Sequence, residues 1–91
     1  MSNGNNVVDF MRSEGYIRFR ADCEASSRDL YAVYRLWCED NALKALSARS
    51  FGLYVCENLE LYGLEQSNNI YLPGGRRVRG FVGVELLQRA A

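Results

Sequence analysis

The spacing of apolar residues between Ser27 and Leu59 predicts two amphipathic helices joined by a short turn. In the first helix, apolar residues recur at i, i+3, i+4, i+7 and i+8, which is one face of a 3.6-residue period: Leu30, Val33, Tyr34, Trp37 and Cys38. The second helix repeats the pattern at i, i+4 and i+8, with Phe51, Val55 and Leu59. Helices joined so closely must pack together, and such a pair is the usual kernel of a helix-turn-helix.

Hydroxyl side chains mark where both helices begin. Ser26 and Ser27 precede the first apolar stripe, and Asp29 lies in its first turn. Ser47 precedes the second stripe. A serine at this position accepts a backbone N–H bond that the helix itself leaves unpaired, so these residues set the expected start of each helix.

A further short helix is predicted near the start of the chain, from apolar residues at i, i+3 and i+4: Val7, Phe10 and Met11. Gly15 is expected to end this helix. The segment 16–19 either extends the helix or forms a strand, because its pattern fits both. Residues 23–25 fit a short strand that leads into the serine cap.

After Leu64 the period of the pattern changes to two, which is typical of a strand. One side would carry Val78, Gly80, Val82, Val84 and Leu86, and the other Arg79, Phe81, Gly83 and Glu85. Residues 70–72 supply a partner strand, and the Pro-Gly-Gly at 73–75 supplies the turn of a hairpin. The expected fold class is therefore α+β: a winged helix-turn-helix with three helices and a C-terminal β-hairpin wing.

Length and composition fit one small domain. The chain has 91 residues, of which 48% are hydrophobic, enough for a single packed core. We expect the domain to span residues 7–88, with flexible ends at 1–6 and 89–91. Because no apolar run reaches the length of a membrane span and the polar start is not a signal peptide, we expect a cytoplasmic protein without a membrane partner.

Recognisable catalytic and metal-site motifs are missing. The chain has no histidine, and its three cysteines, Cys23, Cys38 and Cys56, form no Cys-x-x-Cys pair. We therefore expect no metal, no cofactor, no disulfide framework and no small-molecule substrate. There is also no Gly-x-x-x-x-Gly-Lys phosphate loop and no nucleophile with an activating partner, so an enzyme is not expected.

Charge is balanced in sum and uneven in distribution. Eleven basic residues offset eleven acidic ones, which argues against strong sequence-independent DNA binding. Two blocks stand apart, however. The acidic block comprises Glu57, Glu60 and Glu65, and the basic block comprises Arg76, Arg77 and Arg79. Three arginines within four residues, beside two glycines, are more than an ordinary turn requires and favour contact with phosphate.

An ordered set of motifs resembles a known family. The set is Leu30-Tyr31-x-x-Tyr34-x-x-Trp37-Cys38-Glu39-x-Asn41, then Leu46-Ser47-x-x-x-Phe51-Gly52, then Gly75-Arg76-Arg77-Val78-Arg79-Gly80-Phe81-Val82-Gly83-Val84. It resembles the C-terminal winged-helix domain of phage and plasmid primase-helicases, of the satellite-phage alpha replication type. The resemblance implies recognition of a replication origin in double-stranded DNA inside a bacterial host cell. The domain would be either covalently linked to primase and helicase domains or a free-standing relative.

These observations predict a DNA-binding site. The helix that starts near Ser47 would enter the major groove, with base contacts from Arg49, Ser50, Leu53 and Tyr54. Ser47, the free N–H groups of that helix end and Lys44 would hold phosphates. On the wing, the backbone or the minor groove would be gripped by Arg76, Arg77 and Arg79.

Several residues keep a second interpretation. Core packing is favoured over base stacking for Tyr34, Trp37 and Phe51, whereas Tyr31 and Tyr54 fit either role. Glu39 and Asp40 are expected to pair with Lys44 or Arg49, or to remain solvated, rather than to act in catalysis. The alternative function is a protein-docking module, whose acidic face would suit a basic partner.

Overall fold

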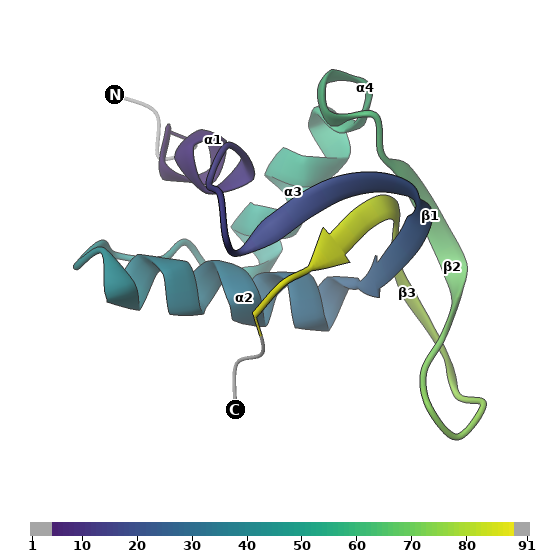
Figure 1. Ribbon diagram of the computed structural model, residues 1–91. Coiled ribbons are helices and arrows are strands. Elements are labelled where there is room, and N and C mark those ends of the chain that lie inside the picture. The colour runs from purple at the N-terminus through teal and green to yellow at the C-terminus, as the bar shows by residue number, and fades with distance from the viewer. Residues whose placement is uncertain (1–4, 89–91) are drawn as a thin grey trace.

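The computed structural model describes residues 5–88. Along the chain lie seven elements: α1 (Asn5–Met11), β1 (Ile17–Ser26), α2 (Ser27–Asp40), α3 (Ala48–Glu57), α4 (Leu59–Tyr62), β2 (Glu65–Tyr71) and β3 (Arg77–Leu86). The strands form one antiparallel sheet in the order β1-β3-β2, with the helices packed along one side (Figure 1). The fold class is thus α+β, with four helices and three strands where three helices and a hairpin were expected. None of these helices is long and apolar enough to cross a membrane.

Both predicted serine caps are confirmed. The Oγ atom of Ser26 accepts a hydrogen bond from the Asp29 N–H at 3.0 Å, and that of Ser47 accepts one from the Ser50 N–H at 3.2 Å. The helix ends differ from expectation. Helix α3 stops at Glu57, so Leu59 starts the separate helix α4. The connection between α2 and α3 covers residues 41–47 and is longer than the predicted short turn.

Strand β1 takes in residues 17–19 of the segment that the sequence left open and also residues 23–25, where a short strand was expected. Its two ends pair with β3, through Phe19 opposite Val84 and Glu24 opposite Val82. Residues 20–23 bulge outward between these pairs, opposite the single residue Gly83. Gly83 has φ +112°, and a Cβ atom there would lie 2.9 Å from the Gly63 carbonyl oxygen. The bulge bends β1 sharply, as Figure 1 shows, and such bends increase the local twist of a sheet.

The same bulge breaks the predicted alternation of β3. Phe81 and Val84 are both buried, although they lie three residues apart. The prediction that Val82 and Val84 lie on one side of β3, opposite Phe81, is therefore wrong, because the register shifts at Gly83. The partner strand β2 is also longer than the predicted 70–72, since it begins at Glu65.

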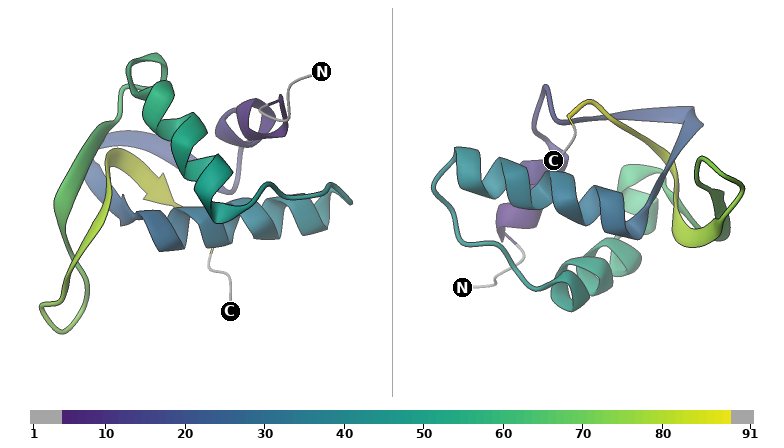
Figure 2. Two further views of the ribbon diagram at one scale, coloured as in Figure 1. Left: turned by 180° about the vertical axis from the view of Figure 1, so that it is seen from behind. Right: turned by 90° about the horizontal axis from the view of Figure 1, so that it is seen from below.

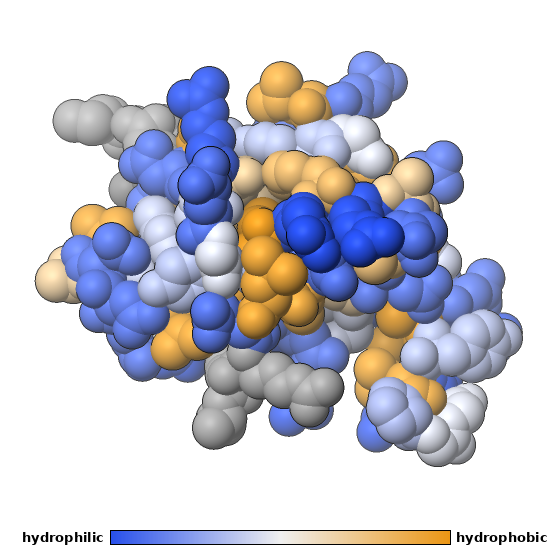
Figure 3. All heavy atoms as spheres, viewed as in Figure 1, coloured by the Kyte–Doolittle hydropathy of each residue, from blue (hydrophilic) through white to orange (hydrophobic). Residues whose placement is uncertain are grey.

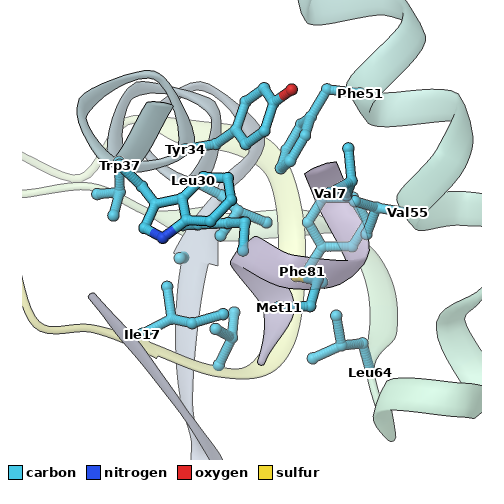
Figure 4. Packing of buried hydrophobic residues seen from close by; sticks show 14 of the residues in the cluster. Val7, Met11, Ile17, Leu30, Tyr34, Trp37, Phe51, Val55, Leu64 and Phe81 are labelled. Atoms are coloured by element: carbon cyan, nitrogen blue, oxygen red, sulfur yellow. The ribbon is translucent and has the colours of Figure 1, made fainter. Parts of the chain in front are cut away.

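The core joins α1, α2, α3 and the sheet (Figure 4). As predicted, the three residues of the α1 apolar stripe are buried, and so are the three core aromatics of α2 and α3: Val7, Phe10, Met11, Tyr34, Trp37 and Phe51. The Tyr34 ring stacks on Phe51 with centroids 4.5 Å apart, and Phe10 packs against its edge at 5.4 Å. Aromatic spacing on these helices therefore reflects core packing rather than a base-stacking platform.

The N-terminal boundaries needed correction. Helix α1 begins at Asn5, so residues 5 and 6 of the predicted flexible start belong to a helix. It ends at Met11, and Gly15 lies in the turn that follows rather than at the helix end. The other predicted flexible positions, 1–4 and 89–91, lie outside the described residues.

The Tyr34 hydroxyl connects three parts of the chain. It donates a hydrogen bond to Asn6 Oδ1 at 3.0 Å and accepts one from the Leu46 N–H at 2.9 Å. The neighbouring Tyr31 hydroxyl donates to the Leu46 carbonyl at 2.7 Å, and its ring packs against Phe51. Tyr31 thus has a structural role, which resolves its two interpretations.

Truncating the core aromatic of α3 should destabilise the fold strongly. Phe51 is 1% exposed, so Phe51→Ala should lower the free energy of unfolding by about 3 to 5 kcal/mol through lost burial and a new cavity. Leu53, two residues away on the same helix, is 53% exposed, and Leu53→Ala should cost less than about 1 kcal/mol. Urea unfolding of both variants tests the difference, and equal losses would contradict the assigned core.

Stability should also fall in strong base because of Tyr34. Burial raises the pKa of Tyr34 to about 12, whereas an unfolded tyrosine titrates near 10. The native state favours the neutral phenol, so this contribution is complete below pH 10 and is lost as the pH rises towards 12. The free energy of unfolding should decline less steeply over this interval in Tyr34→Phe. Parallel declines in both proteins would contradict this role.

Candidate nucleic-acid interface

Helix α3 separates a buried face from an open one. Phe51 and Val55 point into the core, whereas Arg49, Ser50 and Leu53 are exposed on the other side. This is the face that the sequence predicts to contact bases. Tyr54, the fourth predicted base contact, is half-buried and packs against the core, so it contributes less to the open face.

The start of α3 is arranged locally by its cap. The Ser47 hydroxyl accepts from the Ser50 N–H and donates to Ser50 Oγ at 3.1 Å. The Phe51 N–H bonds to the Ser47 carbonyl, which leaves the N–H groups of Ala48 and Arg49 at the open end of the helix. Those two amides are therefore better placed than the Ser47 hydroxyl to hold an anion.

The β2–β3 hairpin presents the predicted arginines. Its turn is closed by bonds from the Leu72 N–H to the Arg76 carbonyl at 2.8 Å and from the Gly75 N–H to the Leu72 carbonyl at 3.0 Å. Arg76, Arg77 and Arg79 are all exposed. Figure 2 (left) shows α3 crossing the front of the molecule while the hairpin projects beyond it at the lower left. Both elements are thus open to solvent from the same side.

The hairpin arginines differ in their surroundings. Arg77 donates to Asn69 Oδ1 on β2 at 3.4 Å. Arg76 and Arg79 line a recess that the hairpin forms with the first turns of α2, and Arg28 of α2 lines it too. Sequence reasoning missed Arg28. Its position on the exposed side of a helix is ordinary for arginine, and only the tertiary structure brings it to the wing.

Lys44 lies apart from the wing. It is in the connection that follows the C-terminal end of α2, where its carbonyl oxygen accepts a bond from the Asn6 side chain at 2.9 Å. The hairpin lies by the N-terminal end of the same 14-residue helix, about 21 Å away along its axis. Lys44 and the wing arginines could therefore contact only separate stretches of a ligand.

The acidic block and the hairpin arginines lie at opposite ends of β2. The exposed acidic block lies where α3 ends, at α4 and at the first residue of β2, whereas the arginines follow the last residue of β2. A strand of seven residues separates these ends by about 20 Å. The acidic block and the hairpin arginines are therefore separated and do not interleave.

The expected pairing of Glu39 and Asp40 with Lys44 or Arg49 is wrong. Among residues 5–88 the ion pairs are Arg18 with Glu85 at 2.6 Å and Arg20 with Asp22 at 3.3 Å. Asp40 instead accepts a hydrogen bond from the Tyr16 hydroxyl at 2.6 Å, which raises the pKa of Tyr16. Glu39 is exposed, in agreement with the solvated alternative.

No protein-family model, curated protein or solved structure matches this chain. The assignment of the site therefore depends on the residues themselves.

The angle of the wing depends on a close contact at Gly80. A Cβ atom at this position would lie 2.2 Å from the Ala25 carbonyl oxygen and 2.8 Å from a side-chain carbon of Ile70. Gly80→Ala should therefore lower the free energy of unfolding by several kcal/mol or displace the hairpin from β1. Gly52→Ala is the control, because its Cβ atom would meet nothing within 4 Å. In a helix this substitution should stabilise by about 0.5 to 1 kcal/mol. Equal melting temperatures for both variants would contradict the contact.

Proposed function

We propose that this chain is a winged-helix domain that binds duplex DNA through α3 and the β2–β3 hairpin. The order α1-β1-α2-α3-β2-β3, with only the four-residue α4 inserted before β2, supports a winged helix. So does the sheet order β1-β3-β2, which sets the hairpin beside the helix pair. In DNA-binding proteins of this kind, the second helix of such a pair enters the major groove.

One observation carries the proposal. Three exposed arginines that form no ion pair among the described residues stand on a hairpin beside the open face of a capped helix. On this interpretation Arg49, Ser50 and Leu53 read base edges or thymine methyl groups. Arg76, Arg77 and Arg79 neutralise backbone phosphates and fix the orientation on the duplex.

The biological setting follows from the sequence resemblance. If the chain acts as the C-terminal domain of a phage or plasmid primase-helicase, its binding would direct that enzyme to the repeats of a replication origin. The domain itself would then recruit, and the chemistry would lie in the linked primase and helicase domains.

The second candidate is a protein-docking module, favoured by exposed apolar residues near the acidic block. Leu61 is 71% exposed, and Phe19 stacks on Tyr62 with centroids 5.9 Å apart. The Tyr62 hydroxyl is buried without a hydrogen-bond partner among the described residues. Seen from the side of Figure 1, the surface has a central apolar patch and smaller ones separated by hydrophilic side chains (Figure 3).

Binding titrations over a salt series distinguish the roles of wing and helix. The probes are a duplex selected by the parent protein from a randomised pool and its scrambled counterpart. Replacing all three wing arginines with alanine should weaken binding to both duplexes. The slope of log affinity against log salt concentration should fall by about 0.9 for each phosphate that is no longer neutralised. Arg49→Ala should instead reduce the binding free energy by about 1 to 3 kcal/mol, and only for the selected duplex.

Arg12→Ala serves as the control, because Arg12 is exposed just after α1, outside the proposed interface. It should bind both duplexes as the parent does. If the wing variant and Arg49→Ala also match the parent, this face does not recognise DNA, and the docking module becomes the better proposal.

A further inference from the structure

A recess of about 510 Å³ lies between the start of α2 and the wing. Ser26, Arg28 and Asp29 line it from the side of α2, and Arg76 and Arg79 line it from the hairpin. The two groups lie far apart in the sequence. Folding therefore brings together the guanidinium groups of Arg28, Arg76 and Arg79, which no sequence motif places side by side.

The charges in this recess are unbalanced. Three arginines face one carboxylate, that of Asp29, and none of the three forms an ion pair with any described residue. Arg18 and Arg20 of β1, by contrast, each have a carboxylate partner. Cations gathered without counter-charges repel one another and are stabilised by a bound anion.

The recess also offers a buried hydroxyl. Ser26 is 4% exposed, and its Oγ atom accepts the capping bond from the Asp29 N–H. A hydroxyl that accepts in this way retains its own proton for donation. Guanidinium forks together with a hydroxyl donor are the groups that bind the oxygens of a phosphate.

We propose that this recess binds a phosphate group between α2 and the wing, with Arg28, Arg76 and Arg79 as its cationic ligands. The source of this phosphate rests on the proposed function: the phosphate belongs to the backbone of the DNA that α3 reads. A strand held there would contact the wing and α2 together, which fixes its position relative to α3. A free phosphate ester offers the same chemistry, and the experiment separates the two sources.

The experiment compares three variants of the full chain. Arg28→Gln removes a cation, and Asp29→Asn removes the opposing carboxylate while keeping the backbone N–H that Ser26 caps. Arg35→Gln is the matched control, because Arg35 is exposed on α2 two turns beyond Arg28 and does not line the recess. Thermal unfolding of each variant verifies that the fold is intact.

Affinity is measured for tripolyphosphate by calorimetry and for the selected duplex over a salt series. Arg28→Gln should bind both about tenfold more weakly, the usual effect of removing one charged hydrogen bond, and its salt slope on the duplex should fall by about 0.9. Asp29→Asn should bind both more tightly, and Arg35→Gln should match the parent.

The outcomes separate the two proposals. If the parent binds the duplex and Arg28→Gln has the same affinity as the parent for both tripolyphosphate and the duplex, the phosphate site is wrong while DNA binding stands. If the parent binds tripolyphosphate through Arg28 but binds no duplex, DNA binding is wrong and the recess takes a free phosphate ester. If the parent binds neither probe, both proposals are overturned.

Discussion

The side chain of Tyr34 holds the position of α3. Its ring stacks on Phe51 at 4.5 Å, and its hydroxyl accepts a bond from the Leu46 N–H just before the Ser47 cap. The same hydroxyl reaches α1 through Asn6 at 3.0 Å. Because a ring contact and two hydrogen bonds meet at one residue, α1, α2 and the start of α3 cannot move independently. The open face of α3 is therefore presented from a rigid base, which base-specific contacts require.

The direction of the wing has a separate origin, in the bulge of β1 opposite Gly83. Four residues of β1 face one of β3 there, which bends the sheet and lets Phe81 and Val84 both reach the core. At Gly80, where β3 passes the end of β1, the backbones approach too closely for any side chain. These two glycines determine how the hairpin leaves the sheet, and hence where its arginines lie relative to the first turns of α2.

The sequence predicted the features that depend on residues close to one another along the chain. The helix stripes, except at Leu59, and the caps at Ser26 and Ser47 were correct, because periodicity and capping act over a few residues. Strand β1 was left open since the bulge removes its alternation, and β3 was assigned the wrong side because one glycine shifts its register. The role of Arg28 was not accessible, since it arises only when the hairpin folds against α2. Likewise Tyr54 remained undecided until packing turned it towards the core.

Zero net charge would argue against DNA binding if the acidic block lay among the hairpin arginines, but it lies at the other end of β2. At physiological ionic strength the interaction between exposed charges is screened over about 8 Å. The acidic block lies about 20 Å from the arginines along β2, so it offsets little of their attraction for a phosphate. Asp29, inside the recess, is the carboxylate close enough to matter. Local placement rather than total charge thus decides which anion the hairpin arginines can hold. Glu57, at the end of α3, is the residue of the acidic block that a duplex read by α3 would approach most closely, because the other two lie beyond the end of that helix.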